Sequence, residues 1–126
     1  MARVAHFEIH ATDPKAALAF YGAVFGWTVA MEMSPDYLLV STGEGPGIDG
    51  AIMKRMGPPP AEGQPVNGYV CTLPVADIEA AGEAAVAAGG TRAAAKVAVP
   101  GFGWNAYFKD PDGNIFGLWQ DDPAAA

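Results

Sequence analysis

The most informative segment for the fold of this chain is 104-WNAYFKDPDGNIFGLWQ-120. Two apolar runs flank a polar turn, 110-DPDGN-114. Pro111 presets φ for the first corner of a type I turn, and Gly113 can take the positive φ that follows. Aromatic and β-branched flanks favour strands. The stretch therefore predicts a β-hairpin, with Phe108 and Phe116 in the core.

Composition restricts the function classes. The chain has 126 residues, of which 51% are hydrophobic and 17% charged, as in a globular domain. The net charge of -7 and the absence of a basic patch argue against nucleic acid as a partner. No apolar run is long enough for a membrane span or a signal peptide, so we expect a cytoplasmic protein. Cys71, the single cysteine, lies in an apolar run and predicts a buried, inert thiol.

The first half begins with an alternating strand over 4–11. Its apolar residues share one face, and His6, Glu8 and His10 share the other. Asp13 then caps a helix that ends at Gly26. The strands expected next cover 27–33, 37–42 and 51–56, with a turn at 34–36 and a glycine-rich loop at 43–50.

The same order of elements returns in the second half. A strand over 69–75 precedes a helix that Asp77 caps and Gly89-Gly90 ends, and strands over 91–99, 104–109 and 115–120 follow. Asp77 lies 64 residues after Asp13, as Gly90 does after Gly26. This indicates an internal duplication of βαβββ modules within one domain over 1–126. Repeat one covers 3–56, the linker 57–65 and repeat two 66–120, and we expect the tail 121–126 to be frayed.

Two such modules predict an α+β fold. Each module is expected to form a curved mixed sheet with its helix on the outer face. The inner faces would then enclose a pocket.

These features resemble the vicinal oxygen chelate superfamily, which includes glyoxalase I, extradiol dioxygenases, and fosfomycin- and bleomycin-resistance proteins. The resemblance is carried by 6-HFEI-9 with the helix that follows it, by 75-VADI-78 through 88-AGG-90, and by the 110-DPDGN-114 hairpin. It extends over nearly the whole chain. It implies paired βαβββ modules, a concave pocket and a homodimer.

Members with metal chemistry place four His, Gln or Glu ligands in the pocket, two from each half. The resemblance puts the first ligand on His6, and its counterpart in the second half on Val70, which has no donor atom. The last ligand falls on Gly117, which has no side chain. The remaining ligand belongs on the strand over 51–56, which holds no His, Glu or Gln. Only His6 therefore matches the metal pattern.

The residues His6, Glu8 and His10 form a second candidate site. Neighbours at i and i+2 on a strand lie about 6.6 Å apart, so two of the three could share an ion. A catalytic zinc site usually needs three protein ligands, which the rest of the sequence does not supply. A solvated strand face, a ligand-binding wall, and a general base formed by His6 or Glu8 remain open.

Aromatic residues supply the third candidate. If Gly117 faces the pocket, alternation places Ile115 and Trp119 beside it. With a four-residue turn the facing strand contributes Trp104, Ala106 and Phe108, whereas the opposite parity contributes Asn105 and Tyr107. Trp104 and Trp119 are alternatively core residues.

The leading hypothesis is a glyoxalase/bleomycin-resistance-like protein that binds a small organic molecule in an apolar, aromatic pocket without a complete metal site. The ligand-binding set is His6, Glu8, His10, Val70, Trp104, Tyr107, Gly117 and Trp119. We expect no cofactor and a homodimer. The alternatives are a lyase, isomerase or dioxygenase-type enzyme with a divalent metal at His6, and an accessory domain with a closed cleft.

Overall fold

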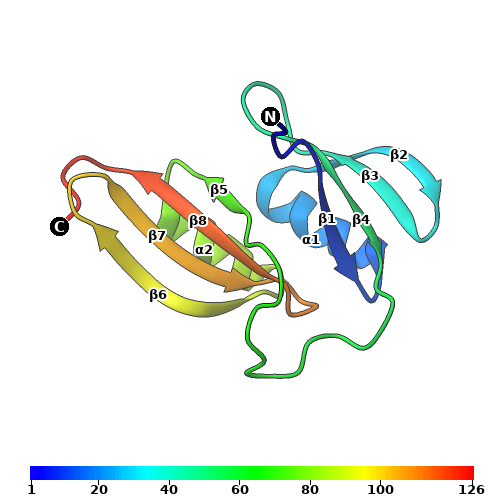
Figure 1. Ribbon diagram of the computed structural model, residues 1–126. Coiled ribbons are helices and arrows are strands. Elements are labelled where there is room, and N and C mark those ends of the chain that lie inside the picture. Colours follow the sequence, from blue (N-terminus) through cyan, green and yellow to red (C-terminus); the bar gives the residue numbers. More distant parts are fainter. The chain divides into compact units, whose positions relative to one another are not determined.

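The computed structural model describes residues 1–126, which divide into two compact units, Met1–Pro59 and Pro60–Ala126 (Figure 1). The first unit contains, in chain order, β1 (Phe7–Ala11), α1 (Pro14–Phe25), β2 (Thr28–Ser34), β3 (Tyr37–Ser41) and β4 (Gly50–Lys54). The second contains β5 (Thr72–Pro74), α2 (Ile78–Ala87), β6 (Thr91–Val99), β7 (Gly103–Lys109) and β8 (Ile115–Asp121). No helix is long and apolar enough to cross a membrane.

Each unit builds a four-stranded mixed sheet of the same topology. The strand orders are β1-β4-β3-β2 and β5-β8-β7-β6. β1 with β4 and β5 with β8 pair in parallel, and the other neighbours are antiparallel. The predicted α+β fold with two βαβββ modules is confirmed. The pocket expected between the two sheets stays a prediction.

The helices begin and end where the sequence predicts. Asp13 accepts a hydrogen bond from the Ala16 amide at 3.2 Å, and Gly26 closes α1 in the left-handed region at φ 76°. In the second unit, Asp77 accepts a hydrogen bond from the Ala80 amide at 3.1 Å, and Gly89 follows α2 at φ 104°. The same local chemistry thus sets both helix–sheet connections.

Each helix packs on one face of its own sheet. In the first unit, Phe20 and Tyr21 of α1 are buried, as are Leu38, Val40 and Ile52 of the sheet. In the second unit, the fully buried Phe108 packs against α2 at Gly82, where an added Cβ would lie 2.7 Å from the tip of the ring. Figure 1 shows α2 behind the sheet of β5–β8, so the helix-free face of this sheet is toward the viewer.

The hairpin of β7 and β8 is confirmed, and its turn is held by Asp110. This carboxylate is only 3% exposed. Oδ1 accepts hydrogen bonds from the Asp112 and Asn114 amides at 2.9 Å each, and Oδ2 accepts one from Asn114 Nδ2 at 3.0 Å. Gly113 takes φ 87°. Lys109 pairs with Ile115, so the loop has five residues, and not the four assumed for the first of the two strand parities.

Two further predictions are wrong. Cys71 is exposed, because regular strand structure is confined to Thr72–Pro74 and the apolar run 69–75 is not a buried strand. The C-terminal tail is not frayed, since Ala125 is only 4% exposed. The Ala125 carbonyl accepts a hydrogen bond from Gly101 at 2.9 Å, and its amide donates to Asp122 at 3.1 Å.

Candidate functional site

Side-chain contacts show which face of each sheet carries no helix. In the first unit, the Phe7 ring lies 5.5 Å from that of Trp27, which stacks on Tyr21 of α1 at 4.7 Å. Phe7 is therefore on the helix side, and the next residue, Glu8, faces away. In the second unit, Phe108 contacts α2, so its neighbour Tyr107 lies on the helix-free face.

The pairing registers place equivalent residues of the two units in matching rows. One row of the first unit runs Glu8, Ala51, Leu39 and Met31, and the next runs His10, Met53, Tyr37 and Ser34. The corresponding rows of the second unit are Thr72, Gly117, Tyr107 and Ala94, then Pro74, Trp119, Asn105 and Val97. All of these rows belong to the helix-free faces. Ala51 is therefore the counterpart of Gly117.

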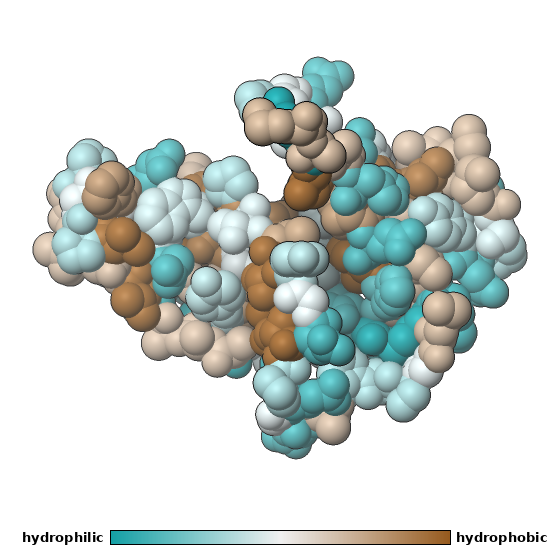
Figure 2. Space-filling view, in the orientation of Figure 1, coloured by the Kyte–Doolittle hydropathy of each residue, from teal (hydrophilic) through white to brown (hydrophobic).

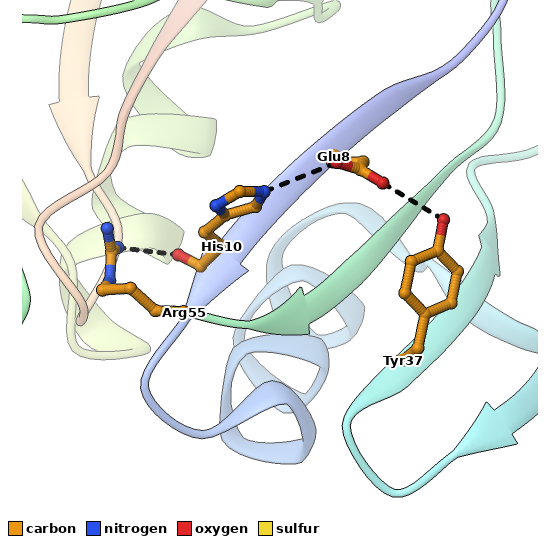
Figure 3. A network of polar contacts seen from close by, with 4 residues as sticks. All are labelled: Glu8, His10, Tyr37 and Arg55. Atoms are coloured by element: carbon orange, nitrogen blue, oxygen red, sulfur yellow. Dashed lines mark hydrogen bonds and ion pairs between the residues drawn. The ribbon is translucent and has the colours of Figure 1, made fainter. Parts of the chain in front are cut away.

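The first unit carries a polar cluster on this face (Figure 3). Glu8 joins two side chains: Oε1 lies 3.4 Å from His10 Nε2, and Oε2 accepts a hydrogen bond from the Tyr37 hydroxyl at 3.3 Å. Partial burial, followed by this hydrogen bond and the Glu8 charge, raises the pKa of the Tyr37 hydroxyl above its usual 10.0. The Arg55 guanidinium donates to the His10 carbonyl at 2.7 Å and fixes this end of β1.

The cluster differs from the predicted trio of His6, Glu8 and His10. His6 lies one residue before β1, is exposed, and its side chain makes no hydrogen bond within the chain. Sequence reasoning missed Tyr37, because its approach to Glu8 depends on the alignment of β3 and β1 against β4. A carboxylate bound by a phenol and an imidazole can accept or relay a proton, or bind a cationic group.

The second unit carries aromatic side chains on the equivalent face. The Tyr107 ring lies against Gly117, and an added Cβ there would be 3.3 Å from the ring. The Trp119 ring lies against Gly103 in the same way, and its Nε1 donates to Asp121 at 2.7 Å. In the space-filling view, teal polar side chains gather over β1 and β4, whereas paler and brown ones cover β6–β8 (Figure 2). The two faces thus differ in chemistry despite their common topology.

The five-residue loop settles the parity of β7. Tyr107 and Asn105, not Trp104, Ala106 and Phe108, share the face of Gly117 and Trp119. The Lys96 ammonium lies 4.6 Å above the Trp104 ring and pairs with Glu79 of α2 at 2.7 Å, which places Trp104 on the helix side. Trp104 also donates to Asp122 at 3.0 Å, which lowers the pKa of that carboxyl below its usual 3.8.

The residues at the four metal-ligand positions of the superfamily do not form a metal site in this chain. His6 alone has a donor atom, since Val70, Ala51 and Gly117 have none. Nor do neighbouring residues compensate, because no group of three or more His, Cys, Asp or Glu residues lies together. At Gly117 even a Cβ would be only 3.1 Å from Thr72 Oγ1. Val70 is exposed and lies two residues before Thr72.

Comparisons with known proteins agree with this architecture. Residues 6–119 match the family model of the glyoxalase-like domain. The chain belongs to this glyoxalase-like family. It is therefore a member of the vicinal oxygen chelate superfamily, as its hairpin and repeat indicate. No curated protein matches the chain.

Solved structures show the same fold at low identity. A glyoxalase-related enzyme from Fulvimarina pelagi is 22% identical with a TM-score of 0.72, covering 100% of this chain and 98% of its own. A glyoxalase/bleomycin resistance protein/dioxygenase family enzyme from Burkholderia phytofirmans PsJN is 20% identical with a TM-score of 0.73, covering 96% and 100%. The lactoylglutathione lyase from Agrobacterium tumefaciens is 16% identical with a TM-score of 0.68, covering 95% and 94%.

Proposed function

We propose that this glyoxalase-like protein binds a small organic molecule on a helix-free sheet face and does so without a bound metal. The observation that carries the proposal is the chemistry of the four ligand positions, of which only His6 retains a donor. An aromatic face beside one of the vacated positions gives an organic ligand apolar surface and hydrogen-bonding groups together. Sequestration of a toxic or antibiotic compound is one version of this function.

Metal content tests the proposal directly. The purified chain is treated with a chelator, dialysed against Ni, Zn, Mn, Fe(II) and Co ions, and analysed by mass spectrometry. We expect far less than one ion per chain. One tightly held ion that disappears in a His6→Ala variant would contradict the proposal and favour the metal-dependent lyase, isomerase or dioxygenase alternative.

Ligand binding is tested by thermal unfolding with the chelator present throughout. A ligand at about 100 times its Kd stabilises the native state by about 2.7 kcal/mol, which raises Tm by several degrees. We expect shifts of this size for some organic compounds of a diverse library. A screen in which every shift requires added metal would refute metal-free binding.

The assembly and compartment belong to the same proposal. A homodimer of this 13.0 kDa chain would give about twice that mass by light scattering after size-exclusion chromatography. We also propose a cytoplasmic location, which the low cysteine content supports, since a single cysteine cannot form an intrachain disulfide.

A further inference from the structure

We propose that the Tyr107 ring, which lies against Gly117, occupies the space of the superfamily's last metal ligand. Together with Trp119, this ring binds a planar heteroaromatic ligand. This inference rests on the proposed function, because it names the ligand class of that metal-free site. Gly117 is then a specificity-determining residue.

Gly117 pairs directly with Tyr107 across β7 and β8. A Cβ added at Gly117 would lie 3.3 Å and 3.6 Å from two ring atoms of Tyr107 and 3.1 Å from Thr72 Oγ1. Any longer side chain would have to begin between these groups and displace the ring. A metal-binding carboxylate at this position would therefore require the Tyr107 ring to move from its observed place.

A second aromatic residue extends the surface. Trp119 pairs with Asn105, two residues before Tyr107 on β7, and its ring lies against Gly103. Two aromatic side chains thus lie on one face of two adjacent strands, each against a glycine of the neighbouring strand. The Tyr107 side chain is 38% exposed, so part of its ring is open to a ligand.

Unpaired polar groups lie among these rings. The side-chain amide of Asn105 and the Tyr107 hydroxyl make no hydrogen bond within the chain, although Asn105 is half-buried. A ligand that stacks on the rings can therefore bond to both groups with its edge. Aromatic surface with adjacent donors and acceptors suits a planar ring that contains heteroatoms rather than a pure hydrocarbon.

Charge orients such a ligand. Asp121 accepts the Trp119 indole N–H at 2.7 Å and places a carboxylate at one end of the aromatic surface, while Lys109 lies at the hairpin end. Aromatic faces attract cations, and the chain has a net charge of -7. The geometry therefore favours a planar cation with its charged edge toward Asp121 over a planar anion.

Titration of the whole chain with proflavine, a planar heteroaromatic cation, tests the inference by calorimetry. Tyr107→Leu removes the ring and keeps an apolar side chain. The matched control is Tyr69→Leu, which removes a fully exposed tyrosine before β5. We expect Tyr107→Leu to weaken proflavine about tenfold or more, Tyr107→Phe to remain within a few-fold of the parent, and Tyr69→Leu to have no effect. Anthracene-9-carboxylate should bind at least tenfold more weakly than proflavine.

A Gly117→Leu variant gives an independent readout, because it displaces the ring without removing it or changing the charge. We expect the same loss of proflavine binding, with the circular dichroism spectrum retained. Should Tyr107→Leu fail to fold, Gly117→Ala takes its place, since its Cβ shifts the ring by tenths of an ångström and should measurably weaken binding.

The outcomes separate this inference from the proposed function. No proflavine binding, or equal binding by Tyr107→Leu and Tyr69→Leu, overturns the ligand class. If chelator-insensitive Tm shifts with other organic compounds persist in that case, the proposed function survives. A tightly bound metal ion in the parent chain overturns both.

Discussion

Removing the Asp110 carboxylate should destabilise the chain far more than the loss of one surface charge. Asp110 is 3% exposed, and its carboxylate accepts hydrogen bonds from two backbone amides and one side-chain amide of its own turn. A hydrogen bond to a charged group contributes about 1.5–3 kcal/mol, and water can replace part of it at this half-exposed turn. We therefore expect Asp110→Ala to lower the free energy of unfolding by about 2–4 kcal/mol. This is a large share of the roughly 5–15 kcal/mol of a typical domain.

The Asp110→Asn variant refines the prediction. Its single amide oxygen can still accept hydrogen bonds from the two backbone amides. Its NH2 group, however, would face the Asn114 NH2 group, which now donates a hydrogen bond to the carboxylate. The expected loss is about half that of Asp110→Ala. Glu62→Ala is the charge-matched control, because it also removes one negative charge, from an exposed residue of the same unit.

Urea denaturation followed by tryptophan fluorescence measures all three variants, and the linear dependence on urea gives the free energies. An Asp110→Ala variant that is no less stable than Glu62→Ala would contradict this prediction. The hydrogen bonds of the turn would then contribute nothing beyond what water supplies.

Gly82→Ala should destabilise the chain because its Cβ would lie 2.7 Å from the buried Phe108 ring, although alanine favours a helix over glycine by about 1 kcal/mol. Adding Phe108→Leu should reduce this loss of stability, as measured by urea denaturation in a double-mutant cycle. Tyr37→Phe should remove a tyrosine that ionises above pH 10.0 from an alkaline titration followed by absorbance. Because folding raises the pKa of Tyr37, the parent loses this contribution to stability as pH rises above 10.0, and the variant does not. Trp104→Phe should raise the pKa of Asp122, measured by NMR. The parent keeps the Asp122 contribution above pH 3.8 and loses it as pH falls through the lower pKa of the folded state.

Local chemistry explains why so much of the fold is predictable from sequence. Asp13 and Asp77 cap the helices through hydrogen bonds to amides three residues later, and Gly26 and Gly89 end them at positive φ. These interactions depend only on neighbours in the chain. The repeat of the two modules is visible because the caps and glycine stops recur in both halves.

The candidate site depended on registers, which the sequence does not fix. One additional residue in the turn after Lys109 exchanges the two faces of β7, so Tyr107 and Asn105 take the place expected for Trp104. Similarly, Tyr37 approaches Glu8 only because β4 holds β1 and β3 in register. Contacts of this kind join residues distant in sequence, and alternation alone gives two possible answers for each strand.

Gly117 shows how a missing side chain can be misinterpreted at the level of sequence. Alignment to the superfamily presents it as the loss of a ligand, and Ala51 occupies the equivalent position in the first unit with the same lack of a donor. The structure gives only Gly117 an aromatic partner on the facing strand, since Leu39 stands where the second unit has Tyr107. Duplication therefore leaves equivalent positions free to specialise separately. A bound organic ligand should accordingly respond to substitutions at Tyr107 and not to Leu39→Ala, and the reverse dependence would assign binding to the face of the first unit.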